Sequence, residues 1–367
     1  MAQVQMSRGE LLVLTVAAVT GFGHFITVAQ VLQAAGRDAW LALTVALLPA
    51  LALALILGAL AYLKPGQALD ILAARLFGKW AGKTVSLFYG VFFLLAVAMT
   101  LRCLVDFMRN AFNPLTPSLA MTVIFMLLAL YAVLSGLENI ARVSLLLLPL
   151  MIVLGLTLTV ISLEEKEYIL LLPVAERGML PVIQGAVPLL GLFGELVVLA
   201  VLADTVRDGK YMWQTTLTAV AVFGLMFIGP LTGPVAILGE RIAARTPYPT
   251  FVEIKYAKTL ARFQTIAVLL WVWGSFFRIT FYYYTAARCL GRFCGFRKNS
   301  REMALATGAA IFLTTVYVFP TVAEVKAFID RPFTYLALAV GYLPPPVLLA
   351  GLVVQKLRQG RWVWGTN

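Results

Sequence analysis

Charged residues are scarce in this chain of 367 residues: Asp, Glu, Lys and Arg make up 13% of it, whereas hydrophobic residues make up 61%. Soluble domains typically carry roughly 25% charged residues. The apolar residues also run in uninterrupted blocks of about twenty or more, the length that crosses a bilayer. The composition therefore excludes a water-soluble enzyme and predicts a membrane protein, with no catalytic residues expected.

Histidine and cysteine are equally scarce. His24 is the one histidine, and the three cysteines, Cys103, Cys289 and Cys294, lack the spacing of a zinc finger. A His-rich metal cage or a relay of several histidines therefore cannot be built from this sequence. We expect neither a metal site nor a cofactor.

Short alternating segments are also missing. A transmembrane barrel would show alternating strands of about ten residues, whereas this chain has long apolar blocks, which need helices to satisfy the backbone in lipid. The blocks cover residues 10–33, 38–62, 81–107, 117–136, 139–162, 185–206, 212–239, 262–290, 303–320 and 333–357. We predict an all-α polytopic membrane protein with ten transmembrane helices in one domain, residues 1–367.

The basic excess, a net charge of +12, does not indicate nucleic acid. Lys and Arg fall in short connections between the apolar blocks, where orientation in the lipid bilayer explains them. With the N-terminus inside, the inner connections hold 16 Lys and Arg residues and the outer connections hold 12. The bias predicts that both termini are cytoplasmic.

Two connections show apolar residues at three- and four-residue intervals, the period of an amphipathic helix. Residues 67–77 lie on the predicted inner side and residues 249–261 on the outer side. Each segment is either a plain interfacial helix or an active element. The active alternative is gating or docking for the first segment and a lid over an outward vestibule for the second.

A short motif occurs twice, at Thr20-Gly21-Phe22-Gly23-His24 in the first span and at Gly191-Leu192-Phe193-Gly194-Glu195 in the sixth. The offset of 171 residues between Phe22 and Phe193 also relates the starts of the second and seventh spans. The chain therefore reads as five spans, residues 10–162, followed by five more, residues 185–357. An odd number of spans per repeat makes the second half inverted, and paired Gly-interrupted helices point to a midplane site.

The glycines allow two interpretations. They either break the helices, which frees backbone groups that favour the two ends of a zwitterion, or they permit close helix packing. His24 is likewise either a hydrogen-bonded packing residue or a pH-sensitive group.

Glu195 and Arg278 stand inside apolar spans, where a charge costs at least about 2.5 kcal/mol. We expect both side chains to face the bundle interior. They form either part of a ligand site or a structural ion pair with no ligand role.

Several motifs together resemble the B subunit of spore germinant receptors, the GerAB-type spore germination permeases of the amino acid/polyamine/organocation superfamily. The resemblance covers nearly the whole chain. It rests on Ala35-Gly36-Arg37-Asp38-Ala39-Trp40, Phe77-Gly78-Lys79-Trp80, the segment from Tyr131 to Arg142, Phe193-Gly194-Glu195-Leu196 and Tyr248-Pro249-Thr250-Phe251.

This resemblance implies a LeuT-like fold with broken helices 1 and 6. It implies a small germinant such as an amino acid, and a complex with a membrane A subunit and a lipoprotein C subunit in the inner membrane of the spore or in the cell membrane. The implied ligand-binding residues are Gly21, Phe22, Gly23, His24, Phe193, Gly194 and Glu195, with Phe277 and Arg278 added from the eighth span.

The main alternative function is a proton-coupled amino acid transporter. Many members of the superfamily place a sodium ion or a lysine between spans 1, 5 and 8, whereas the fifth span here has no charge after Arg142. That departure favours a sensor over an ion-coupled pump.

Overall fold

A computed structural model describes residues 6–111, 114–257, 263–296 and 300–359. Most of the chain in these ranges is helical, and the extended pairing within them consists of a single bridge between Met6 and Val206. The all-α prediction is confirmed.

Each of the ten apolar blocks forms helix. In chain order they are α1–η1–α2 (Arg8–Phe22, Gly23–Thr27, Val28–Ala35), α3 (Ala39–Leu63), α5 (Lys79–Ala111), α6 (Ser118–Ser135), α7 (Leu137–Ile161), α8–η5–α9 (Met179–Gly194, Glu195–Val197, Val198–Val201), α10 (Met212–Leu238), α13 (Gln264–Cys294), α14–η9 (Arg301–Leu313, Thr314–Val318) and α16–α17 (Thr334–Tyr342, Pro344–Arg358). Within the described ranges, eight helical segments are long and apolar enough to cross a membrane. The α-helices that open the first and ninth spans are shorter and continue through π-helical turns.

Short helices fill the connections: η2 (Gly36–Asp38), α4 (Leu69–Phe77), η3 (Leu163–Glu165), η4 (Tyr168–Leu171), η6 (Ala203–Thr205), η7 (Gly209–Tyr211), α11 (Glu240–Ala243), α12 (Pro249–Tyr256), α15 (Val322–Phe328) and η10 (Ile329–Phe333). The predicted amphipathic helix at 67–77 is thus confirmed as α4.

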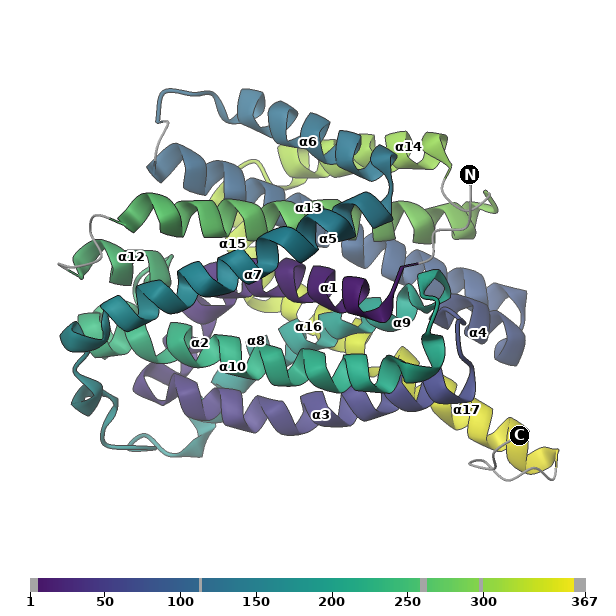
Figure 1. The fold of residues 1–367 in the computed structure, drawn as a ribbon, viewed down its shortest axis with the longest axis horizontal. Coiled ribbons are helices and arrows are strands. Elements are labelled where there is room, and N and C mark those ends of the chain that lie inside the picture. The colour runs from purple at the N-terminus through teal and green to yellow at the C-terminus, as the bar shows by residue number, and fades with distance from the viewer. Residues whose placement is uncertain (1–5, 112–113, 258–262, 297–299, 360–367) are drawn as a thin grey trace.

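The helices lie side by side in a bundle, with α13 packed along α5 and α1, and α3 packed along α10 and α8 (Figure 1). The start of α1, the end of α17 and α4 share one end of the bundle, while α12 lies at the opposite end (Figure 1). The two ends that the sequence assigns to opposite sides of the membrane are therefore physically separate. The repeat boundaries, 10–162 and 185–357, stay a prediction.

The predicted interruptions of spans 1 and 6 are present as changes of helix type. Span 1 passes through the π-helical turn η1, and span 6 passes through the 3₁₀ turn η5. Gly23 and Gly194 nevertheless keep right-handed helical dihedrals, with φ of −57° and −59°. Of the two interpretations of these glycines, departure from helical dihedrals is therefore not the one observed at Gly23 and Gly194.

Close packing explains the glycines instead. A Cβ atom on Gly274 would lie 2.6 Å from the Cα of Gly21, where α13 meets α1, and a Cβ on Gly194 would lie 2.8 Å from the carbonyl oxygen of Ala337 in α16. Gly341 faces Gly194 across the same contact. Small residues let helix backbones approach in this way. Each interrupted span therefore packs against a neighbouring helix through direct backbone contact.

We expect Gly274→Ala to lower stability by about 1–3 kcal/mol, because the added methyl group overpacks a backbone contact. The melting temperature of the purified protein in detergent measures this loss. Gly155→Ala is the matched control, since nothing lies within 4 Å of a Cβ placed there, and it should be neutral or slightly stabilising. Equal melting temperatures for wild type and Gly274→Ala would contradict the packing interpretation.

Candidate functional site

Glu195 and Arg278 form an ion pair within the bundle. Arg278 lies midway along α13, and Glu195 is the first residue of η5. The Nη1 and Nη2 atoms of Arg278 donate to Glu195 Oε2 and Oε1 over 2.5 and 2.7 Å. The two side chains are 0% and 2% exposed. Because an unpaired buried charge is strongly destabilising, this bidentate pair holds spans 6 and 8 together.

Two further side chains bond to this pair. The Tyr282 hydroxyl donates to Glu195 Oε2 over 2.8 Å, and Arg278 Nε donates to Thr100 Oγ1 over 3.1 Å. The Arg278 guanidinium also lies 4.6 Å from the centroid of the Tyr282 ring, within cation–π range. Spans 3, 6 and 8 therefore meet at one set of hydrogen bonds.

Sequence reasoning left both of these partners out of the site. Tyr282 follows Arg278 by one helical turn, so the i, i+4 rule could have placed it on the same face of α13. Thr100 lies 178 positions from its partner, and a threonine in an apolar helix is no signal by itself.

A small cavity of ≈ 20 Å³ borders Glu195. Its wall comes from spans 1, 6 and 10: Thr27, Gln30, Pro188, Gly191, Leu192, Glu195, Ile329, Phe333, Thr334 and Ala337. A cavity of this size holds about one water molecule. An amino acid therefore needs a conformational opening before it can reach Glu195.

A larger pocket of ≈ 50 Å³ lies next to this cavity, and Gln30 and Ile329 line both. Gln30 Nε2 donates to the carbonyl oxygen of Ile329 and to Asp330 Oδ1, each over 3.3 Å. Tyr248, just before α12, is part of the wall of the larger pocket. Gln30, which makes two long hydrogen bonds, and Ile329 thus lie between the pocket on the α12 side and the cavity at Glu195.

The remaining predicted residues of span 1 lie elsewhere. Gly21 packs against α13, and the side chain of Phe22 lies outside what the structure describes. A Cβ on Gly23 would meet the Phe227 ring of α10. His24 also faces α10, because its Nε2 donates to the Met226 carbonyl over 3.1 Å. This hydrogen bond fits the packing role for the histidine.

The predicted phenylalanines also point away from the ion pair. The Phe193 ring meets Phe223 of α10 edge to face, 6.1 Å between centroids. Phe277 is buried, and as the immediate neighbour of Arg278 it occupies a different face of α13. The structure therefore brings Glu195 and Arg278 together and places the two phenylalanines apart from them.

The short helix α12 is bonded to the interrupted part of span 1. Thr250 Oγ1 donates to the carbonyl oxygen of His24 over 3.2 Å. The Tyr248 hydroxyl donates to Asp106 Oδ2 of α5 over 3.4 Å. These contacts favour the lid interpretation, for which residues 249–257 of the predicted segment are described and the rest lies outside the described residues.

A buried ion pair fastens α12 to the connection after α7. Lys166 Nζ lies 3.1 Å from Glu253 Oε1, with side chains 3% and 10% exposed. Gly233 of α10 leaves room for this carboxylate, since any Cβ there would clash with it. Burial raises the pKa of Glu253 above its usual range, while Lys166 opposes that rise.

The raised pKa makes the stability of the folded protein depend on pH. The folded protein binds this proton more tightly than an unfolded chain does, so the stabilisation is greatest at low pH and is lost as pH rises through the folded-state pKa. We expect the melting temperature of wild type relative to Glu253→Gln to fall as pH increases from about 5 to about 8, around and above the ordinary pKa of glutamate.

Glu176→Gln serves as the control, because its side chain is 58% exposed, and it should parallel wild type at every pH. Parallel curves for wild type and Glu253→Gln would contradict the prediction.

A search of solved structures shows the fold. The structure of MhsT in complex with L-phenylalanine aligns over 100% of this chain and 91% of that chain, with a TM-score of 0.69 and 13% sequence identity. At this identity the likeness concerns the fold alone. It confirms the LeuT-like architecture that the motifs imply.

Sequence comparison shows the family. The model of the family described as "Spore germination protein" matches residues 5–322. Spore germination protein KB of Bacillus subtilis (strain 168) is 25% identical over 357 residues, which cover 92% of this chain and 93% of the relative. Spore germination protein XB of Bacillus anthracis is 28% identical over 170 residues, 46% of this chain and 48% of the relative. The chain therefore belongs to the spore germination permease family.

Proposed function

We propose that this chain is the permease-like subunit of a spore germinant receptor, which binds a small amino acid at the Glu195–Arg278 pair and signals to partner subunits. The observation that carries the proposal is the fully buried bidentate pair beside a cavity that spans 1, 6 and 10 enclose. Buried charges inside membrane spans mark functional sites by default.

The ion pair favours a zwitterionic ligand. A ligand with one charge could replace only one partner, and the other buried charge would remain unpaired at a cost of about 3–5 kcal/mol. The carboxylate of a free amino acid can instead bind Arg278 while its ammonium group binds Glu195. Tyr282 and Thr100 hold the two protein groups in place during this exchange.

The route to this site leads through the pocket beside α12. Gln30 and Ile329 are the shared wall of that pocket and the cavity, so their separation would admit the ligand. Of the predicted residues, Glu195 and Arg278 bind the ligand in this proposal. Gly21, Gly23, Gly194, His24, Phe193 and Phe277 shape the helices around it.

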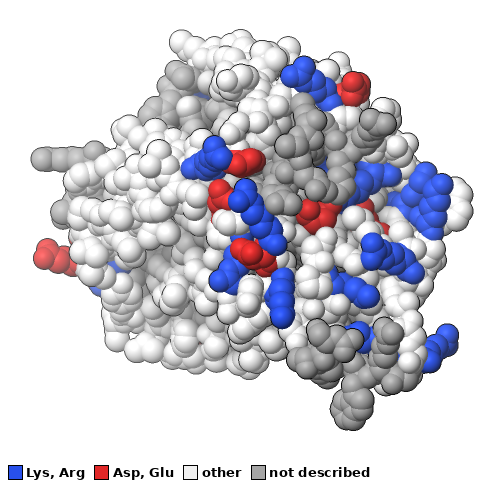
Figure 2. Space-filling model, turned by 45° about the vertical axis from the view of Figure 1, so that its right-hand side comes forward, with Lys and Arg blue, Asp and Glu red and all other residues white. Residues whose placement is uncertain are grey.

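The charge distribution supports cytoplasmic termini. Lys and Arg spread over the right-hand half of Figure 2, the face that includes the α4 end of the bundle, with fewer Asp and Glu among them. Exposed basic residues at this end include Arg75, Lys79, Arg207, Lys210, Arg301 and Arg358. In this orientation the cytoplasmic face of the protein is basic. Signalling to the membrane A subunit and the lipoprotein C subunit then begins in a chain with this charge distribution.

Cys294 tests the orientation. Its thiol is exposed at the end of α13, whereas Cys103 and Cys289 are buried. We expect a membrane-impermeant thiol reagent to label Cys294 in inside-out vesicles but not in intact cells, in a Cys103→Ser background that removes the thiol lining the α12-side pocket. Labelling from outside intact cells would reverse the assigned topology.

Ligand titrations on charge variants test the site. A thermal-shift screen of the neutral L-amino acids identifies the best ligand, and its amide and deaminated analogues supply the single-charge comparisons. We expect Glu195→Gln to weaken binding of the zwitterion by about 30-fold or more, because one desolvated charged contact is worth roughly 2–5 kcal/mol. Both single-charge analogues should bind wild type more weakly than the zwitterion.

Stability measurements separate a ligand role from a structural one. Glu195→Gln should lower the melting temperature, and added Arg278→Met should partly restore it, since the double variant leaves no unpaired buried charge. Glu138→Gln, at an exposed surface pair, is the matched control. Unchanged ligand affinity in Glu195→Gln would reject the ligand role, and amino acid flux by the purified chain alone in liposomes would favour the transporter alternative.

A further inference from the structure

Span 6 and α13 are joined at a second place, near the α4 end of the bundle. Asp204 Oδ2, in η6, accepts hydrogen bonds from Arg288 Nη2 and Arg292 Nη2, each over 2.7 Å. The three side chains are at most 12% exposed. The same two elements therefore carry two ionic contacts, one at Glu195 and one at Asp204.

Helix α4 is tied to this second contact. Arg292 Nη1 donates to Asp70 Oδ1 over 2.6 Å, and Ser86 Oγ of α5 donates to Asp70 Oδ2 over 2.8 Å. Arg292 thus divides its guanidinium between Asp204 and Asp70. We call Asp70, Asp204, Arg288 and Arg292 the inner clamp.

The two elements differ in stiffness. Arg278 and Arg292 belong to one continuous helix, and their 14-residue separation puts them about 21 Å apart along its axis. Glu195 and Asp204 lie instead in a segment of three short helices, in which the α-helix α9 stands between the 3₁₀ turns η5 and η6. We therefore expect a displacement of Glu195 to rotate the segment η5–α9–η6 relative to the continuous helix α13 and to move Asp204.

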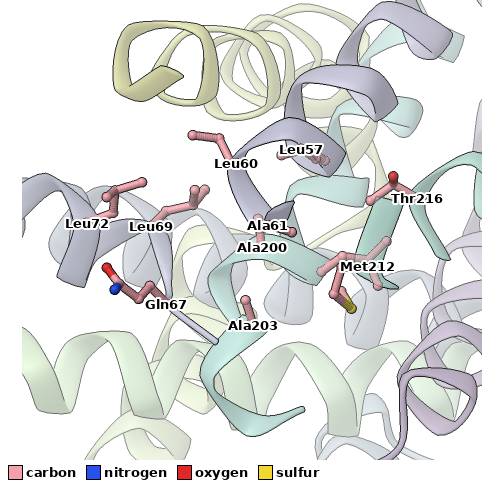
Figure 3. Close-up of a pocket in the computed structure, with 11 residues that line it drawn as sticks. Leu57, Leu60, Ala61, Gln67, Leu69, Leu72, Ala200, Ala203, Met212 and Thr216 are labelled. Carbon is pink, nitrogen blue, oxygen red and sulfur yellow. The ribbon is translucent and has the colours of Figure 1, made fainter. Parts of the chain in front are cut away.

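The packing between α4 and the inner half of span 6 leaves a small gap of ≈ 10 Å³. Figure 3 shows a small pocket between α4 and the inner half of span 6, with Leu69 and Leu72 on one side and Ala200 and Ala203 on the other. Most of the lining side chains there are apolar, with Gln67 and Thr216 as the polar exceptions.

The links of the inner clamp are unequal. Asp204 is held by two guanidinium groups, whereas Asp70 is held by one together with a serine hydroxyl. Both arginines donate hydrogen bonds to the Asp204 carboxylate. We therefore expect Arg292 to move together with Asp204. Asp70 then keeps a buried charge without its cation, which disfavours the docked position of α4.

We propose that the inner clamp regulates α4, so that opening of the Glu195–Arg278 pair draws Arg292 from Asp70 and releases α4 at the cytoplasmic face. Under the function proposed above, on which this inference rests for its trigger, ligand binding opens the pair. Helix α4 is then the element whose release reports an occupied site to the partner subunits.

Hydrogen–deuterium exchange on the purified full chain in nanodiscs tests this coupling without any ligand. Glu195→Gln opens the central pair, and we expect exchange of the α4 peptide, residues 69–77, to rise at least about fivefold, the lower end of a typical coupling free energy. Helix α6, which carries no residue of either ionic group, should keep its wild-type rate.

A second substitution makes the test specific. In an Asp70→Asn background α4 is already uncoupled, so added Glu195→Gln should leave its exchange unchanged. Asp38→Asn is the matched control, because Asp38 is also buried but bonds to Ala175 N instead of the clamp, and it should preserve the full response. Tyr282→Phe, which removes one hydrogen bond to Glu195, should give the same pattern at smaller amplitude if Glu195→Gln fails to fold.

The proposal is overturned if the exchange rate of α4 is unchanged in both Glu195→Gln and Tyr282→Phe. It is also overturned if these substitutions raise that rate equally in the Asp70→Asn background. Either result leaves the ligand titrations unaffected, because the exchange experiment contains no ligand. A failed titration with an intact α4 response would conversely reject the proposed ligand site and keep the coupling.

Discussion

Placing a guanidinium where water does not reach is the constraint on which the rest of this bundle depends. Arg278 is fully buried in the middle of a membrane-spanning helix, and each of its three guanidinium nitrogens donates a hydrogen bond to a specific acceptor. Glu195 supplies the counter-charge from span 6, and Thr100 supplies a hydroxyl from span 3. The register of three spans is thereby set by one side chain, since a slip along any of them would strand a charge in a low-dielectric interior.

Sequence patterns predict what can be recognised from one segment alone. The ten apolar blocks, the amphipathic α4 and the exceptional positions of Glu195 and Arg278 each stand out within a window of about twenty residues. What a residue meets across the bundle is not encoded in that window. His24 follows a Gly-containing motif yet bonds to α10, and the motif glycines pack against other backbones while keeping helical dihedrals. Their partners become visible only in three dimensions.

The two ends of the bundle are closed by different chemistry. At the α12 end, hydroxyl groups of Thr250 and Tyr248 donate across the gap, and one lysine–glutamate pair adds charge. At the α4 end, two arginines share two aspartates. Separating a desolvated ion pair leaves a buried charge unpaired, and this holds for Lys166–Glu253 as well as for the arginine–aspartate contacts. The two ends therefore differ in their donors, with hydroxyl groups and one lysine at the α12 end and two arginines at the α4 end.

The glycine contacts bear on how the interrupted spans can move against their neighbours. Helices that interlock through side-chain ridges must lift one ridge over another in order to rotate. Where Gly21 meets Gly274, and where Gly194 meets Gly341, neither helix presents a ridge. At these contacts each interrupted span can therefore rotate without lifting one side-chain ridge over another. The ionic contacts at Glu195 and Asp204 then remain as the interactions that oppose such a rotation.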